Sequence, residues 1–508
     1  MMEVGSSVRS KNGRVAVSAD GQIPEALLRL LFGEQPDGAA DAADGGDHAG
    51  RYHALLQRAV CAASMGGSYV AVAHAERFML LGRPEGSSTC YRLVSVGGDA
   101  ALPGETVTAL YCMDIYAPAP AQQARPGSPP LCVVAGYSTG HVRVFSAYGR
   151  LLMAHQLHPQ PVLRIRLRMP LQDQRAAPAQ PAAPDDVEEM CLTYADGTMV
   201  CVNGQSLYLA LRLCLNEALA GEADAPALQY KKWAFDLGVS SVADAVSYGP
   251  AAGADPLALL AKGAATSDPL PPDATARFLV APRHGEAAFG VFMTSEDAAT
   301  SFSAAAIAGK VAAKVTGAVL SIAMSYFWRG GDGGGGGGDG SGAEAAGPGG
   351  AHRTEQGTPV PCVFAVRDSP RKVLDISLAP AQRGLAALTD SLGRVLLFDL
   401  ESCEVVHMLK GLRGSQCAWL ETQHGVYVVV CAAARGVVEV YELAQMERPL
   451  ASVNVGPGWA LHQCPAQPLG GSLLVGPGGS ERRAALPLLA SCMLLNSRGQ
   501  TAQISIVL

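Results

Sequence analysis

A β-hairpin pattern that returns along the chain is the feature that most limits how this sequence can fold. Each copy has an apolar run, a turn of Ser, Thr, Asp or Gly, and an alternating run that ends in an aromatic residue. The clearest copies are residues 131–145, 385–398 and 426–441. A single hairpin cannot bury both of its faces, so neighbouring copies must cover one another in a stacked or radial array. Such arrays usually bind partners rather than catalyse reactions.

About seven hairpins of this kind can be counted. The others fall at residues 69–81, 190–202, 278–292 and 489–508, and a further strand is predicted at residues 106–113. This number fits a common β-propeller, in which each blade is a four-stranded sheet and closure of the ring removes the exposed sheet edges. The sequence therefore predicts an all-β, WD-like β-propeller of about seven blades over residues 51–508.

Segments that cannot pack separate or precede these hairpins. Residues 1–50 are rich in Gly, Ala and Asp after a short amphipathic segment at residues 23–32, so most of this stretch is expected to be a disordered tail. A Gly-rich tract over residues 330–360 is predicted as a disordered linker, because glycine offers no side chain to bury. A dinucleotide-binding loop is excluded there, since that loop needs a strand before it and a helix after it.

The longest helical pattern covers residues 301–329. Lys310 and Lys314 interrupt its apolar stretch, which argues against a membrane-spanning helix and predicts an amphipathic helical insertion that lies on a surface. Its apolar face and aromatic end are the candidate membrane contacts Val311, Val315, Val319, Ile322, Tyr326, Phe327 and Trp328. The alternative is a helix that packs across a propeller face or between blades.

The composition of the 508-residue chain supports a packed core and excludes one class of partner. Hydrophobic residues make up 49% of the chain, charged residues 16%, and the formal net charge is -7. That charge gives no electrostatic reason to expect a nucleic acid. The 13 cysteines are scattered without a Cys-x-x-Cys pair, which is typical of buried thiols in a reducing compartment. Because the N-terminus lacks the apolar stretch of a signal peptide, a cytoplasmic protein is expected.

One candidate docking patch combines aromatic and basic residues. Tyr230, Lys231, Lys232 and Trp233 fall in a stretch that is predicted to lie between blades. Aromatic anchors beside charges suit a protein partner. The alternative is that the aromatic rings seal a blade edge while the lysines are only solvated.

Further partner-binding candidates lie in predicted turns and connections. Arg283 and His284 follow a strand, Arg435 occupies a similar turn in a later hairpin, and Arg413 and Trp419 share a stretch that neither strand nor turn chemistry requires. Basic residues on a propeller rim suit an acidic partner, although solvated turn charges are the commoner case.

The sequence predicts no catalytic residue, cofactor site or metal site. It has no Gly-x-Ser-x-Gly elbow, no phosphate-binding loop and no pair of histidines at metal spacing on a helix, so nucleophilic and metal chemistry lack their usual signatures. Asp196 and Asp390 lie at hairpin turns, where an aspartate caps its own backbone. We therefore do not expect an enzyme.

Several segments together resemble a known family. They are residues 133–145, 161–165, 228–233, 366–371, 388–399, 410–419 and 434–441, with the helical segment that ends at Trp328. In order and content they resemble the N-terminal region of the regulatory, non-catalytic subunit of the two-subunit Rab GTPase-activating protein complex. The resemblance covers residues 69–508. Family members typically carry a long further region after the propeller, so this chain is shorter than the family pattern.

The resemblance implies a regulatory subunit whose partners are the catalytic subunit of that complex and a Rab GTPase. It also implies a role in vesicle traffic, with peripheral contact to endoplasmic reticulum or vesicle membranes, and no arginine finger from this chain. Two alternatives stay open. One is a generic WD-like propeller scaffold with other partners, and the other is a propeller enzyme with an acid pair or a metal in its channel.

Overall fold

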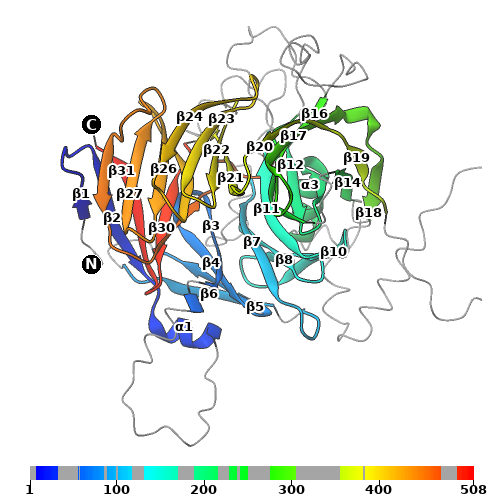
Figure 1. Ribbon diagram of the computed structural model, residues 1–508. Coiled ribbons are helices and arrows are strands. Elements are labelled where there is room, and N and C mark those ends of the chain that lie inside the picture. Colours follow the sequence, from blue (N-terminus) through cyan, green and yellow to red (C-terminus); the bar gives the residue numbers. More distant parts are fainter. Residues whose placement is uncertain are drawn as a thin grey trace, which may run out of the picture.

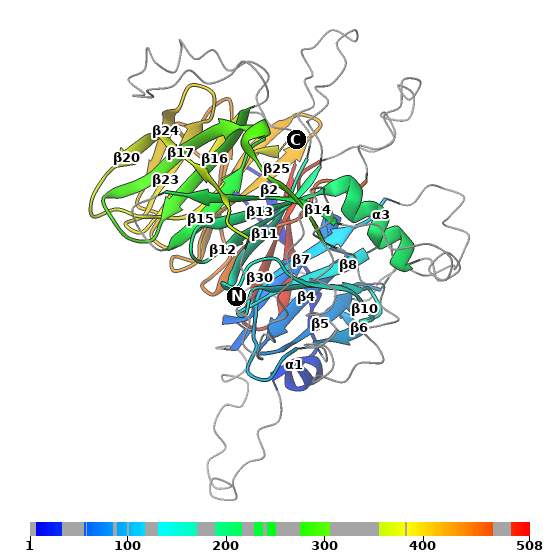
Figure 2. The same ribbon diagram turned by 90° about the vertical axis from the view of Figure 1, so that its right-hand side faces the viewer.

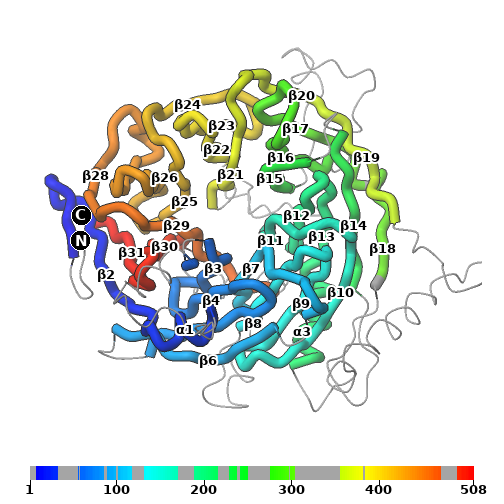
Figure 3. Tube along the Cα trace, turned by 60° about the horizontal axis from the view of Figure 1, so that its bottom comes forward, coloured from blue at the N-terminus to red at the C-terminus, as the bar shows by residue number. Residues whose placement is uncertain are grey.

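The strands of the computed structural model repeat the hairpin pattern of the sequence and assemble into seven sheets around a central axis (Figures 1 and 3). Each sheet is one blade of a β-propeller, and the blades are numbered in chain order. The structure describes residues 7–32, 55–56, 58–84, 89–98, 101–116, 131–169, 188–215, 228–236, 241–249, 275–304, 355–380, 384–470 and 489–507.

The first four blades use the following strands. Blade 1 contains β3 (Val60–Ala63), β4 (Tyr69–His74), β5 (Arg77–Gly82) and β6 (Arg92–Gly97). Blade 2 contains β7 (Val107–Asp114), β8 (Leu131–Tyr137), β9 (His141–Ser146) and β10 (Leu151–Gln156). Blade 3 contains β11 (Val162–Arg168), β12 (Glu189–Tyr194), β13 (Thr198–Asn203), β14 (Leu228–Phe235), β18 (Ser301–Ala304) and β19 (Thr358–Val360). Blade 4 contains β15 (Val242–Ser247), β16 (Thr275–Pro282), β17 (Ala287–Ser295) and β20 (Cys362–Arg367).

The remaining blades complete the ring. Blade 5 contains β21 (Val373–Leu378), β22 (Leu385–Asp390), β23 (Arg394–Asp399) and β24 (Glu404–Lys410). Blade 6 contains β25 (Ser415–Thr422), β26 (Gly425–Ala432), β27 (Val437–Glu442) and β28 (Ala451–Asn454). Blade 7 contains β29 (Trp459–Gln463), β30 (Cys492–Asn496), β31 (Gln500–Ile506), β2 (Val15–Gln22) and β1 (Ser7–Arg9).

The seven predicted hairpins are the second and third strands of the seven blades, as the antiparallel pairs from β4–β5 to β30–β31 confirm. Residues along β8 show why neighbouring blades are needed. Cys132 and Val134 pack in the cluster between blades 2 and 3, whereas Val133 and Ala135 pack in the cluster between blades 1 and 2. Because successive strand residues point to opposite faces, each hairpin buries both faces only between two neighbours.

The ring closes by pairing strands from distant parts of the chain. The first strands of successive blades contact one another around the centre, and β29 of blade 7 contacts β3 of blade 1. In blade 7, β2 pairs antiparallel with β31, which places Val17 opposite Ile504 and Ala19 opposite Ala502. This pairing supplies the fourth strand of the blade and covers an edge that β31 would otherwise expose.

The expectation of a mostly disordered tail over residues 1–50 is wrong for residues 7–32. These residues form β1, β2 and helix α1 (Glu25–Phe32). Val15, Val17 and Ala19 alternate along β2 and are buried between blades 6 and 7, and burial of such an alternating set stabilises a strand. Residues 33–50 lie outside the described residues.

Two further domain expectations need correction where the structure describes them. Residues 301–304 form β18, which pairs antiparallel with β14, rather than the start of a helix. Residues 358–360 form β19, which pairs parallel with β14, rather than part of a linker. The physical reason is that the outer edge of β14 offers unpaired backbone groups, which short segments satisfy. Residues 305–354 lie outside the described residues.

The alternation of strand directions divides the connections between two faces of the ring. The turn between the second and third strands of a blade and the connection to the next blade meet on one face, which we call the short-loop face. Backbone hydrogen bonds show this meeting, for example from Ser391 N to Lys372 O (2.8 Å) and from Val455 N to Gly436 O (2.8 Å). The long connections in blades 2, 3 and 4 leave from the opposite face.

The described helices lie on the outside of the blades. Helix α1 contacts β4 and β5, and helix α3 (Gly204–Leu215) contacts β10, β13 and β14 (Figure 2). None of the helices in the described ranges has both the length and the apolar character that crossing a bilayer requires.

Candidate functional site

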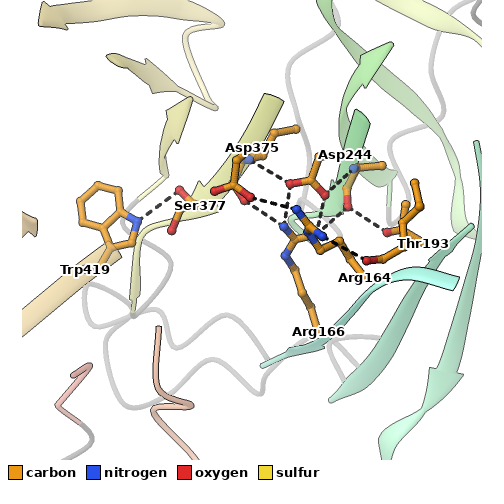
Figure 4. Close-up of polar contacts among 10 residues, drawn as sticks. Arg164, Arg166, Thr193, Asp244, Asp375, Ser377 and Trp419 are labelled. Atoms are coloured by element: carbon orange, nitrogen blue, oxygen red, sulfur yellow. Dashed lines mark hydrogen bonds and ion pairs between the residues drawn. The ribbon is translucent and has the colours of Figure 1, made fainter. Parts of the chain in front are cut away.

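Charged residues of three inner strands meet at the centre of the ring (Figure 4). Arg166 of β11 donates from Nη1 to Asp244 Oδ1 (2.8 Å) and from Nη2 to Asp244 Oδ2 (2.7 Å). Arg164 of the same strand has its Nη2 atom 3.7 Å from Oδ1 of Asp375 in β21. Because β15 carries Asp244, this cluster joins blades 3, 4 and 5.

Backbone groups complete the surroundings of Asp244. Its carboxylate also accepts hydrogen bonds from Ile376 N and Ala245 N, each at 2.9 Å. The Arg166 guanidinium donates to Ala245 O (3.2 Å) and Ile376 O (3.1 Å). A buried carboxylate is tolerated when a charged partner and further donors satisfy its oxygens, and Asp244 meets both conditions.

The same contacts bear on the alternative of an enzyme with an acid pair in its channel. Such an enzyme needs acids that can exchange protons with a substrate, but the Asp244 side chain is 0% exposed and tied to Arg166. Burial and the nearby Asp244 carboxylate raise the pKa of Asp375, whose side chain is 36% exposed and lies beside Arg164. Each aspartate thus has an arginine beside it, and the four side chains come from three blades.

Turn aspartates have the structural role that the sequence indicated. Asp196 Oδ1 accepts from Thr198 N (3.0 Å), and its Oδ2 lies 2.7 Å from His158 Nε2 in the connection from blade 2. Asp390 Oδ1 accepts from Leu392 N (3.0 Å) and Arg394 N (2.7 Å). Both aspartates therefore fix turns on the short-loop face.

A second charged cluster holds the connection between blades 1 and 2. Glu105 is buried and accepts a hydrogen bond from Thr139, with His141 Nδ1 at 3.1 Å and Arg143 Nη1 at 2.7 Å from its oxygens. Burial alone would raise the pKa of Glu105, but these hydrogen bonds and the Arg143 charge hold the pKa at about 2. The carboxylate therefore stays ionised in the fold.

The patch predicted around Tyr230 is not an exposed docking surface. Residues 230–233 lie within β14, not between blades, and Tyr230, Lys232 and Trp233 are buried. Tyr230 stacks on Phe302 of β18 at 5.5 Å between ring centroids. The physical reason is that β13 on one side and β18 and β19 on the other enclose β14.

The two lysines of this stretch are not simply solvated either. Lys231 forms an ion pair with Glu296. Lys232 is only 1% exposed, and its Nζ donates a hydrogen bond to Leu157 O (3.2 Å). Burial lowers the pKa of Lys232. The Trp233 ring packs against Phe278 of blade 4, with 5.3 Å between the ring centroids. This aromatic residue therefore packs between blades, which is closer to the alternative of a structural role than to an exposed anchor.

Trp419 is also buried rather than available to a partner. It lies in β25, the first strand of blade 6, and its Nε1 donates to Ser377 O of blade 5 at 3.1 Å (Figure 4). This bond extends the chain of inner-strand contacts from blade 5 to blade 6. The ring of Trp419 belongs to the cluster between these blades.

The predicted basic turn residues are exposed and lie on one face of the ring. Arg283 and His284 are in the turn between β16 and β17, Arg413 is in the connection from β24 to β25, and Arg435 is in the turn between β26 and β27. All of these positions are on the short-loop face of blades 4, 5 and 6. Their role in partner binding stays a prediction.

The candidate membrane contacts fall in the segment that the structure leaves undescribed. Val311, Val315, Val319, Ile322, Tyr326, Phe327 and Trp328 all lie between residues 305 and 354, outside the described residues. Their role also stays a prediction.

Among the described residues, one group of three has metal-ligand atoms close together. It consists of Glu189, Cys191 and Cys201, with the two Sγ atoms 3.7 Å apart. Arg168 Nη2 lies 2.9 Å from Glu189 Oε2 and balances its charge. The hydrogen bond with Cys191 and burial raise the pKa of the Cys201 thiol. Because a cation needs thiolates, this group fits buried thiols better than a metal ion.

Sequence reasoning missed the central cluster of Arg164, Arg166, Asp244 and Asp375. A usable signal was present in β15, where Asp244 is the one charged residue in a strand of small and apolar residues. A charged residue in such a run usually has a buried partner. The sequence alone could not identify that partner, because Arg166 is 78 positions away.

Comparison with solved structures finds matches of low sequence identity. The crystal structure of Saccharomyces cerevisiae Sqt1 has 11% sequence identity and a TM-score of 0.36, and the match covers 88% of this chain and 83% of that chain. The C-terminal WD40 domain of Sif2 has 10% identity and a TM-score of 0.36, with 88% and 95% covered. Neither likeness adds to the argument for the fold, which rests on the strand pairing.

Comparison with models of protein families finds a match over most of the chain. The model described as Rab3 GTPase-activating protein regulatory subunit N-terminus matches residues 55–461. The matched range runs from the segment before blade 1 to β29 of blade 7, so it includes blades 1 to 6 in full. The chain therefore belongs to the family of the Rab3 GTPase-activating protein regulatory subunit N-terminus.

Proposed function

We propose that the chain is a non-catalytic regulatory subunit of a Rab GTPase-activating complex, and that it positions the catalytic subunit and a Rab GTPase relative to each other. The observation that carries this proposal is the family match over residues 55–461. A closed propeller suits the role, because it is a rigid body with two broad faces and short edges.

Two features support a scaffold rather than an enzyme. The acids that approach each other at the ring centre are paired with Arg164 and Arg166 and link blades. An arginine finger must reach into the nucleotide site of another protein, and Arg166 at the ring centre is bound to Asp244 of this chain instead. We propose that GTP hydrolysis takes place entirely at the catalytic subunit and the Rab.

Co-purification and a GTP hydrolysis assay test the proposal together. The tagged full chain is expected to retain the catalytic subunit, and the chain alone is expected to leave GTP hydrolysis by the Rab at its intrinsic rate. Addition of the chain to the catalytic subunit and Rab is expected to change the rate of hydrolysis. Failure to bind the catalytic subunit, or acceleration by the chain alone, would refute the proposal.

We also propose that the protein is cytoplasmic and contacts endoplasmic reticulum or vesicle membranes peripherally in Rab-dependent traffic. The support is the amphipathic pattern of residues 305–329, with lysines on a narrow polar stripe and aromatic residues at its end. Deletion of residues 305–329, which leaves β18 in place, should abolish co-flotation with small vesicles while the circular dichroism spectrum is retained. Unchanged flotation would contradict this membrane contact.

A further inference from the structure

A set of basic residues forms a continuous arc on the short-loop face of blades 4, 5 and 6, which lie side by side in Figure 3. The set, called the basic arc, is Arg283, Arg371, Lys372, Arg413 and Arg435. Arg283, Arg413 and Arg435 are exposed, and Arg371 and Lys372 are half-buried. On a chain with a net charge of -7, this arc is a local reversal of sign.

Hydrogen bonds join the segments that carry these residues. The Lys372 Nζ atom donates to Gly285 O and to Ala287 O (3.1 Å), which ties the connection before blade 5 to the turn that carries Arg283. Leu412 N donates to Gly393 O (2.9 Å), and Arg435 Nη1 donates to Gly411 O (3.4 Å). The arc is therefore one surface whose parts hold each other in place.

The acids on this part of the face have basic neighbours. Glu286, in the turn that carries Arg283, lies 3.9 Å from Arg367. Asp390 and Asp368 are both bound by Arg394, through Nε at 2.5 Å and Nη2 at 2.6 Å. Arg371 lies 3.7 Å from each of these two aspartates. Among the described residues, Arg283, Lys372, Arg413 and Arg435 have no carboxylate partner, so the arc keeps positive charge for an outside partner.

Two apolar side chains are exposed within the arc. Leu374, at the start of β21, is 48% exposed, and Leu392, in the turn between β22 and β23, is 42% exposed. The turn with Leu392 is held to Lys372 by the bond from Ser391 N to Lys372 O (2.8 Å). The leucines add apolar area beside the basic residues, and arginine is one of the residue types that carry much of the binding energy at protein interfaces.

We propose that the basic arc is the docking surface for an acidic surface of a partner protein. Guanidinium groups bind carboxylates in a bidentate geometry that fixes orientation, and opposite charge on the partner accelerates association. A bilayer with anionic lipids fits less well, because the whole chain is acidic and would be repelled outside the arc. The inference rests on the proposed function, from which we take the partner to be the catalytic subunit.

The test uses a charge reversal and a matched control on the full chain. The arc variant combines Arg283→Glu, Arg413→Glu and Arg435→Glu. The control variant combines Lys11→Glu, Arg77→Glu and Arg92→Glu, which are also exposed and change the net charge equally. Thermal unfolding of both variants checks that the ring is intact, as expected for substitutions at exposed positions.

Binding is measured against three probes: the immobilised full-length catalytic subunit, the GTP-loaded Rab, and vesicles of phosphatidylcholine with phosphatidylserine. We expect the arc variant to bind the catalytic subunit about tenfold or more weakly than the wild type, because attractions become repulsions. The control variant should bind as the wild type does, and raised NaCl should weaken wild-type binding and reduce the difference between wild type and arc variant.

The outcomes separate the two proposals. If the wild-type chain does not bind the catalytic subunit, the proposed function fails. If the wild type binds and the arc variant binds equally well, the docking surface is refuted while the proposed function stands. A loss confined to the Rab or to the vesicles would also overturn the assignment of the arc to the catalytic subunit.

Discussion

Replacement of Asp244 by asparagine tests whether the central cluster stabilises the ring. Asp244 is fully buried and accepts four hydrogen bonds, two from Arg166 and one each from Ile376 N and Ala245 N. Asp244→Asn keeps the shape of the side chain but removes the charge, and its amide group then faces at least one N–H donor. Loss of one member of a buried pair costs about 3–5 kcal/mol, which is the destabilisation we expect.

Arg166→Met and the double variant test whether the loss of stability comes from the Asp244–Arg166 pair. Arg166→Met removes the other member of the pair and leaves the Asp244 charge buried, so a similar loss is expected. The double variant should lose less than the sum of the two single losses, because both remove the same interaction. Arg164→Met is the control, since Arg164 and Asp375 are 46% and 36% exposed and 3.7 Å apart, and such a pair contributes about 0–1 kcal/mol.

Urea unfolding at neutral pH, followed by tryptophan fluorescence, measures these differences. Trp419 is suited as a reporter because its Nε1 donates to Ser377 O next to the cluster. The midpoint should fall clearly for Asp244→Asn and Arg166→Met and stay nearly unchanged for Arg164→Met. If Asp244→Asn shifts the midpoint no more than Arg164→Met, the cluster does not hold the blades together and the reasoning is refuted.

Three other predictions concern turns, protonation and ring closure. Gly140→Ala should destabilise the fold by about 3 kcal/mol or more in urea unfolding, because the new Cβ would lie 1.8 Å from His158 O. Gly411→Ala is the control: Gly411 has a similar φ, but no atom lies within 4 Å of the new Cβ, so the expected cost is only about 1–2 kcal/mol. Burial lowers the pKa of His155 from 6.5 to about 4; the unfolded chain then binds the extra proton, so stability should fall as the pH drops from about 6.5 towards about 4. A His155→Leu variant should lack that part of the pH dependence of the urea midpoint, and an unchanged profile would contradict the assignment. Deletion of residues 1–22 removes β2 and should yield aggregates in size-exclusion chromatography, while deletion of residues 1–9 should leave a monodisperse protein; equal elution of the two deletion variants would argue against closure by β2.

Local chemistry explains which parts of the fold and site were predictable. The seven hairpins follow from alternating apolar residues around short polar turns, and both signals lie within about 15 residues of each other in the chain. The turn roles of Asp196 and Asp390 are equally local, since each caps backbone groups two to four positions ahead. The exposed positions of Arg283, His284, Arg413 and Arg435 follow from the same turn chemistry.

Other features depend on pairs that are far apart in the sequence. Tyr230, Lys232 and Trp233 resemble an exposed patch in the sequence, but β18 and β19 cover the strand that carries them. The partner of Asp244 is 78 residues away, and the partner strand of β2 lies at the other end of the described chain. Such pairings depend on which edges and charges remain unsatisfied after the local elements have formed, and no local pattern contains that information.

The sequence by itself determined the repeating unit, its approximate number and the turns that connect its strands. Only the tertiary structure decided that β2 closes the ring, that residues near Tyr230 are enclosed, and that Arg164 and Arg166 meet Asp244 and Asp375 at the centre. The physical reason is the range of the forces involved: strand alternation and turn capping act between neighbours in the chain, whereas edge pairing and the neutralisation of buried charge act between neighbours in space.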